Sequence, residues 1–151
     1  MRVPRLARAA AIALAASVAI GSCARPVTTP EWQVAQAKRN EITALWTQIR
    51  DWRRAARMDV EPAPASVVAI RGLSVRAARA VCQDGKKPPP TCDDVCDVGD
   101  AICDNAASIC SIAADLGDDP WAKDKCDNAK ASCKEAKKRC CECEHDAESA
   151  P

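Results

Sequence analysis

The chain has 151 residues, a formal net charge of +1 and 11 cysteines, and its aromatic residues are four tryptophans with no phenylalanine or tyrosine. The near-neutral charge gives no electrostatic field that would attract nucleic acid, and the scarcity of aromatic residues argues against a large conventional core. We therefore expect one small domain that is stabilised by crosslinks.

The first 22 residues have the composition of an export signal. Three arginines precede an apolar run at residues 9–20, which is too short to span a bilayer well. The run leads into Ile20-Gly21-Ser22-Cys23, which resembles the lipobox of bacterial lipoproteins. The resemblance implies that Cys23 carries acyl chains such as palmitate and, because the next residue is not Asp, that the anchor lies in the outer membrane. The alternative is an ordinary signal peptide cleaved nearby, with Cys23 a stray thiol.

Composition divides the chain into six predicted segments. These are a lipoprotein signal peptide at 1–22, a tether at 23–30, an amphipathic helical segment at 31–82, a proline-rich linker at 83–90, a cysteine-rich helical hairpin at 91–145 and a tail at 146–151.

The segment after the tether carries helical signals. Thr29 can cap a helix that begins at Pro30 and ends near Arg57. Apolar residues recur at helical spacing along one face of this helix, and two tryptophans belong to that face. Such a stripe is more often core than ligand platform, so we expect it to pack inward, with a partner or lipid surface as the alternative. Its members are Ala35, Ile42, Leu45, Trp46, Ile49, Trp52 and Ala56.

A second helix is predicted from Ser66 to about Val81. It follows a break at Pro62 and Pro64, and Gly72 is its weak point. The residues expected on its apolar side are Val67, Ile70, Leu73, Ala77 and Val81.

Arginines make this half of the chain basic. We expect them to form a solvated face, with contacts to anionic lipid head groups or to the acidic third helix as alternatives. The arginines are Arg50, Arg53, Arg54, Arg57, Arg71, Arg76 and Arg79.

Two further helices are predicted after the linker. Thr91 can cap the first, and Gly117 can end it. Asp118 or Asp119, followed by Pro120, begins the second. Acids crowd the start of the first helix and cations the end of the second, so antiparallel pairing would bring opposite charges together.

The cysteines fix the register of this pairing. Three cysteines in each helix recur every seventh residue and therefore line one stripe. Facing residues of an antiparallel pair have a constant sum of residue numbers, and all three cysteines of one helix match those of the other at a single sum. Small residues between them let the helices approach closely enough for disulfides. The predicted pairs are Cys96–Cys140, Cys103–Cys133 and Cys110–Cys126, then Cys92–Cys143 in an adjacent layer and Cys82–Cys141 by elimination; the small layers are Gly99/Ala136, Ala106/Ala129 and Ala113/Ala122.

A metal-binding interpretation competes with this ladder. Rows of thiols in a helical bundle resemble the bacterial copper storage proteins, which implies Cu(I) coordination, although the chain has only two methionines. The chain departs from that family because its thiols lie on one stripe of two adjacent helices, ready to oxidise. Zinc could also bind through Cys140, Cys141, Cys143 and His145, provided that the helix ends there.

Enzymatic interpretations have weaker support. Cys140-Cys141-Glu142-Cys143 is formally a C-x-x-C motif, but it lies at the end of a helix, where the helix dipole opposes a thiolate. The serines of the hairpin have only His145 as a base. We therefore predict no catalytic residue and no enzymatic activity.

These patterns together predict an all-α protein, a small four-helix bundle with a C-terminal disulfide-laddered antiparallel hairpin. Its general layout resembles uncharacterised cysteine-rich helical lipoproteins of bacteria. We expect a structural or protein-binding role in the cell envelope, with the membrane contacted through the lipid on Cys23, an envelope protein as partner and no nucleic acid. No cofactor and no metal ligand are predicted; the alternative is thiol-based binding or storage of Cu(I) or zinc.

Overall fold

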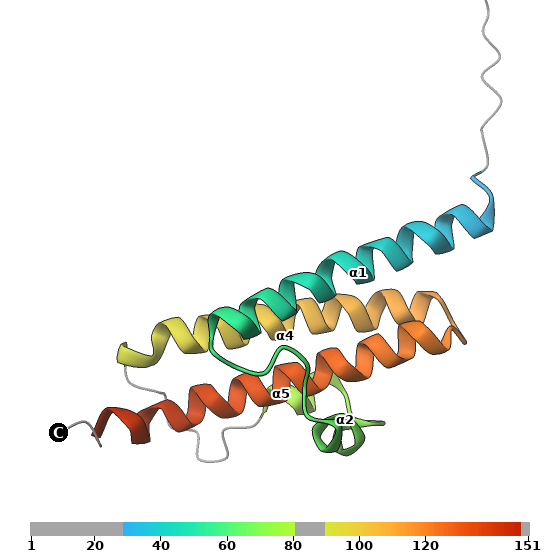
Figure 1. The fold of residues 1–151 in the computed structure, drawn as a ribbon. Helices are drawn as coiled ribbons and strands as arrows, with labels where there is room; N and C mark the ends of the chain where they lie inside the picture. Colours follow the sequence, from blue (N-terminus) through green and yellow to red (C-terminus); the bar gives the residue numbers. More distant parts are fainter. Residues whose placement is uncertain (1–28, 81–89, 149–151) are drawn as a thin grey trace, which may run out of the picture.

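A computed structural model describes residues 29–80 and 90–148, with side chains through Cys143 (Figure 1). Within those ranges the chain is helical and has no β-strand, which confirms the all-α prediction. Its elements are α1 (Glu31–Ala55), α2 (Pro64–Ile70), α3 (Val75–Arg79), the 3₁₀ turn η1 (Pro90–Cys92), α4 (Asp93–Asp115) and α5 (Pro120–Glu148).

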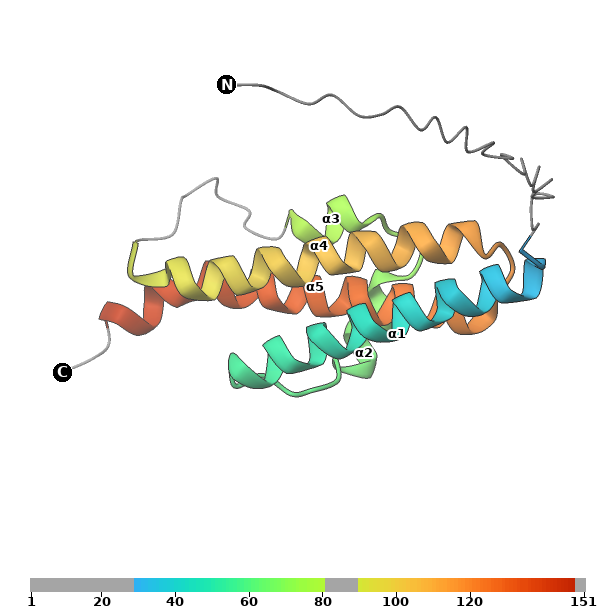
Figure 2. The same ribbon diagram turned by 90° about the horizontal axis from the view of Figure 1, so that it is seen from above.

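Helices α4 and α5 form an antiparallel hairpin that carries the other elements. Helix α1 lies along the hairpin and runs antiparallel to α4, beginning near the turn between α4 and α5 (Figure 1). Helix α2 packs on α5, and Figure 2 shows α3 on the opposite side of the hairpin from α1. The chain between α1 and α3 therefore passes around α5, so the two halves of the sequence form one packed unit.

The core lies between α1 and the hairpin. Ile42 and Ile49 of α1 are fully buried, as are Ile102 and Ile109 of α4. Trp46 is only 6% exposed. The inward packing expected for this apolar stripe is therefore confirmed; its other members, Ala35, Leu45, Trp52 and Ala56, are half-buried.

Two predicted helix caps are wrong. The residue before α1 is Pro30, whose carbonyl accepts from the N–H groups of Gln33 and Val34, so Thr29 lies one position too early. The residue before α4 is Cys92, because Thr91 belongs to the preceding 3₁₀ turn. Neither helix start has a side-chain cap hydrogen bond.

The predicted second helix is broken in two. Gly72 has φ +76°, a left-handed conformation that ends α2 and that glycine adopts without a steric penalty. Ser74 then begins α3, and its side-chain oxygen accepts from the N–H of Ala77. The break also changes the inward face, since Ala78 is buried while Leu73 is 47% exposed. The described chain thus has three long and two short helices rather than four.

The hairpin turn forms as the sequence predicts. Gly117 has φ +64° and ends α4. Asp119 accepts from the N–H groups of Trp121 and Ala122 through Oδ1, at 3.0 and 3.2 Å, and so caps α5. Helix α5 extends to Glu148, beyond the predicted end of the hairpin at residue 145.

Candidate functional site

Four disulfides hold the hairpin together: three join α4 to α5, and the fourth joins Cys92 of η1, just before α4, to α5. The bonded pairs are Cys92–Cys143, Cys96–Cys140, Cys103–Cys133 and Cys110–Cys126, with Cα atoms 6.0, 4.8, 4.6 and 4.7 Å apart, respectively. These are the four pairs that the register of the cysteines predicts. The closest three lie near the short end of the usual disulfide range of roughly 4.4–6.8 Å, so the two helix axes approach tightly.

Small residues between the bridges permit this approach. A Cβ added to Gly99 would lie 3.4 Å from the carbonyl oxygen of Ala136, already in van der Waals contact. The other layers are built from buried alanines, Ala106, Ala113, Ala122 and Ala129. Charge pairing across the hairpin is present as well, because Lys137 Nζ lies 2.8 Å from Asp100 Oδ1.

Two of the predicted cysteine assignments stay predictions. Cys82 and Cys23 both lie outside the described residues, so neither the pair Cys82–Cys141 nor the lipidation of Cys23 is tested. Cys141 is half-buried on α5 and is itself disulfide-bonded.

The bonding pattern bears on the redox and metal interpretations. Cys140 is bonded to Cys96 of α4 and Cys143 to Cys92 of η1, rather than to each other, so the C-x-x-C sequence is not one redox pair. Sulfurs joined in disulfides are not thiolates, the form that coordinates Cu(I) or zinc. Between Thr29 and Ala80 and between Pro90 and Glu148, no group of three His, Cys, Asp or Glu residues is arranged to hold a metal ion.

The rungs of the ladder differ in exposure. Cys103 and Cys133 are fully buried, whereas Cys110 and Cys126 are both half-buried. A hollow of about 340 Å³ borders the Cys110–Cys126 rung, and Lys130 contributes to its wall. This outer rung is therefore the one most open to an external thiol.

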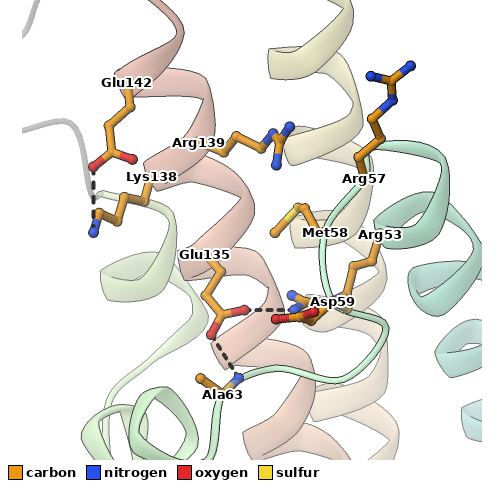
Figure 3. A pocket seen from close by; sticks show the side chains of 9 residues that line it. All are labelled: Arg53, Arg57, Met58, Asp59, Ala63, Glu135, Lys138, Arg139 and Glu142. Carbon is orange, nitrogen blue, oxygen red and sulfur yellow. Dashed lines mark hydrogen bonds and ion pairs between the residues drawn. The ribbon is translucent and has the colours of Figure 1, made fainter. Parts of the chain in front are cut away.

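A second hollow, which we call the distal cleft, lies where α1 ends. Its volume is about 400 Å³. Figure 3 shows it between the 57–63 segment and the last turns of α5. The lining residues are Arg53, Arg57, Met58, Asp59, Ala63, Glu135, Lys138, Arg139 and Glu142.

The backbone at the end of α1 forms a Schellman motif. The N–H of Met58 donates to the carbonyl of Arg53 at 2.9 Å, and the N–H of Arg57 donates to the carbonyl of Arg54 at 3.0 Å. Arg57 occupies the position that glycine usually fills in this motif, with φ +56°. An arginine side chain is therefore held at the edge of the cleft in an unfavourable backbone conformation.

Arg53 forms the floor of the distal cleft. Its side chain is 1% exposed, and its Nη2 lies 2.7 Å from Glu135 Oε2. Its Nε donates to the carbonyl of Asp59 at 2.7 Å, and Nη2 also donates to the carbonyl of Glu61 at 3.1 Å. Glu135 Oε1 accepts the N–H of Ala63 at 3.0 Å. The pair thus fixes the loop after α1 onto α5.

The sequence interpretation of Arg53 as part of a solvated face is wrong. A signal was present, because residues 42, 46, 49 and 53 share one helical stripe, and the first three are core residues. Lys130 is a second buried cation that was not predicted; its Nζ donates to the carbonyl of Leu73 at 3.1 Å and pairs with Asp127 at 2.7 Å. Both cations hold the chain between α1 and α3 against α5.

The arginines of this half divide between solvent and acidic partners. Arg79 pairs with Asp104 of α4, which matches the alternative of contact with the acidic helix rather than the expected solvated face. Arg54 is 61% exposed on its side chain and pairs only with Asp51, one turn away on α1. Arg57 and Arg139 have no acidic partner among the described side chains.

The opposite end of α1 is held by ionic contacts. Arg39 donates to Asp119 Oδ2 from Nε at 2.7 Å, while Lys38 Nζ lies 3.0 Å from Asp115. The Arg39 hydrogen bond lowers the pKa of the Asp119 carboxyl below its ordinary 3.8. Trp32, in the first turn of α1, is 68% exposed.

Comparisons with known proteins give no family. No protein-family model, curated protein or solved structure matches the chain. None of the described helices is long and apolar enough to cross a membrane. Function must therefore be argued from the residues and their geometry.

Proposed function

We propose that the chain is a lipid-anchored protein of the bacterial cell envelope, with the anchor in the outer membrane, and that it acts as a rigid, non-enzymatic binding module. In this proposal Cys23 carries the lipid, and the folded helices present a binding site to an envelope partner. The observation that carries it is the set of four disulfides that join η1 and α4 to α5, together with the lipobox-like sequence at residues 20–23.

The disulfides support export. Bridges of this kind form and persist in oxidising compartments and are rare in a reducing cytosol. The described bridges span 16, 30, 44 and 51 residues and are nested within one another. The first bridge formed would stabilise the hairpin by about 2–4 kcal/mol, and each further nested bridge by less, because it closes only a short additional loop.

The order of the elements supports a role in holding a binding site away from the membrane. Helix α1 begins eight positions after Cys23, at Glu31, so a lipid on Cys23 would place this end of the molecule near the membrane. Its 25 residues rise by about 37 Å at 1.5 Å per residue. The distal cleft lies at the far end of α1, which would hold a ligand there well away from the membrane surface.

The metal-binding alternative has less support. Eight of the ten cysteines after Cys23 are bonded in pairs within the described residues, and a thiolate ligand would require those bonds to be reduced. An exported protein would be reduced only by a dedicated donor. We therefore carry forward the binding-module proposal alone.

Export with the native signal sequence tests the proposal. Cells fed an alkyne-tagged fatty acid should label the protein, and membrane fractionation should recover it with the outer membrane. Cys23→Ser should abolish the label and release the protein from the membrane, whereas Cys110→Ser paired with Cys126→Ser should leave both unchanged. An unlabelled wild-type protein in the soluble envelope fraction would refute the lipid anchor.

A further inference from the structure

We propose that the distal cleft binds an oxyanion, a carboxylate or phosphate group carried by a small molecule or by the end of an envelope polymer. The ligand would contact Arg139 and Arg57, with Arg53 beneath it. This inference deepens the binding role proposed above and rests on it for its biological setting, although the site itself is argued from the cleft alone.

The charges of the cleft favour an anion. Its lining has four cationic and three acidic side chains. Glu135 is engaged by Arg53 and by the N–H of Ala63, and Glu142 lies 3.5 Å from Lys138. After these pairings, the lining keeps two arginines, Arg57 and Arg139, and one carboxylate, Asp59.

The floor of the cleft contains an unsatisfied donor. Arg53 Nη1 is buried and has no hydrogen-bond partner among the described residues, whereas the other nitrogens of this guanidinium are bonded. Arg53 is 1% exposed and lines the cleft. Buried donors are normally paired, so an unpaired one on a cavity wall is a place where a ligand oxygen would improve the structure. Because Nη1 is itself buried, a ligand oxygen can bond it only if the surrounding side chains move.

The two unpaired arginines border the cleft from different elements, Arg139 from α5 and Arg57 from the end of α1. Figure 3 shows Arg139 extending from α5 towards the 57–59 segment, and Arg57 standing at the edge on the end of α1. The backbone favours glycine at position 57, so the arginine side chain there does not serve the turn itself. Strained positions of this kind are often found at ligand sites.

The size and chemistry of the cleft define the ligand class. A volume of about 400 Å³ accommodates a small molecule or a chain end rather than a folded surface. Guanidinium groups offer parallel N–H donors that match two oxygens of a carboxylate or phosphate. Met58 lines the same wall and would contact an apolar part of the ligand next to the anionic group.

Titration of the exported full-length protein in detergent tests this site, with inorganic phosphate and succinate as the two probes. Binding followed by amide chemical shifts should perturb the residues around 57–59 and 138–142 for at least one probe. Arg139→Met should weaken that binding at least tenfold. Arg57→Gly should weaken it several-fold without loss of the fold, because glycine suits the turn.

Arg54→Met is the matched control, since Arg54 neighbours the cleft but does not line it. Its affinity should equal that of the wild type, and binding should persist at about 0.15 M salt, where attraction between exposed charges is screened. A response to phosphate alone or to succinate alone supports the site and identifies the source of the oxyanion. Absence of binding for both probes, or equal losses in Arg139→Met and Arg54→Met, overturns it. Whatever the titration shows, the lipid-labelling test of the proposed anchor keeps its own outcome.

Discussion

Removing the buried guanidinium of Arg53 should loosen the end of α1 and the loop that follows it. Arg53→Met keeps the length of the side chain but removes the charge and three hydrogen bonds, which run to the carbonyls of Asp59 and Glu61 and to the carboxylate of Glu135. Together with the bond from Ala63 N–H to Glu135, these bonds hold the 57–63 loop, which forms one side of the cleft, against α5. We therefore expect a loss of stability that is localised to α1 and this loop.

The burial of the two partners sets the expected magnitude. Breaking a buried ion pair by removing one partner costs about 3–5 kcal/mol. The side chain of Arg53 is 1% exposed, but that of Glu135 is 21% exposed and keeps the N–H of Ala63, so the carboxylate left behind is partly solvated. We therefore expect the lower end of the range, about 3 kcal/mol. Glu135→Gln should cost about 2 kcal/mol, and the double variant less than the sum by at least about 0.5 kcal/mol, because the two residues are in contact.

Urea unfolding of the oxidised protein measures these changes. Tryptophan fluorescence is a suitable signal because Trp46 and Trp52 lie on the inward side of α1. A loss of about 3 kcal/mol should lower the urea midpoint by roughly 1–3 M. Arg54→Met should change the free energy of unfolding by less than about 0.5 kcal/mol. A midpoint for Arg53→Met equal to that of Arg54→Met would refute the structural role of the buried pair.

Three further changes follow from the described geometry. Arg57→Gly should stabilise the fold by about 1 kcal/mol in the same urea assay, because glycine adopts φ +56° without strain; a loss of stability would contradict this. Gly99→Ala should be neutral or stabilising by up to about 1 kcal/mol, whereas Gly99→Leu should force the helices apart at Ala136 and leave alkylatable thiols after oxidative folding. The pKa of Asp119 is lowered by its hydrogen bond from Arg39, so its stabilisation is complete above pH 3.8 and disappears as the pH falls through the lower folded pKa. The difference in thermal midpoint between wild type and Asp119→Asn should therefore shrink as the pH falls below 3.8, and a difference that grows on acidification would refute it.

The hairpin could be predicted because its sequence signals are periodic. A disulfide requires a narrow range of Cα distances, and three cysteines per helix at seven-residue spacing admit few registers. The small residues at Gly99 and Ala136, and the turn signals at Gly117 and Asp119, agree with that register independently. Local and long-range signals thus favour one arrangement of α4 and α5.

The structure of the chain between α1 and α3 could be predicted less well, because tertiary contacts decide where its helices begin and end. Gly72 was expected to weaken a helix, but whether it breaks one depends on how α2 and α3 each pack on α5. The two predicted caps were also wrong, because α1 and α4 begin after Pro30 and Cys92, and neither residue makes a side-chain cap hydrogen bond. A hydroxyl near a helix start is a preference, not a requirement.

The distal cleft was not predicted because its residues are dispersed along the chain. Arg53 could have been suspected from the core stripe that it shares with Ile42, Trp46 and Ile49. Its partner Glu135 is 82 residues away and lies outside any local pattern. The left-handed conformation of Arg57 has no signature in the residue itself.

The intact mass of the exported mature protein, measured without reductant before and after thiol alkylation, tests the lipid anchor and the disulfide ladder together. We predict a mass equal to residues 23–151 plus acyl groups, no added alkyl groups, and crosslinked peptides that join Cys103 to Cys133 and Cys82 to Cys141. An unacylated chain, or one whose ladder cysteines accept alkylating reagent, would contradict a rigid, lipid-anchored module.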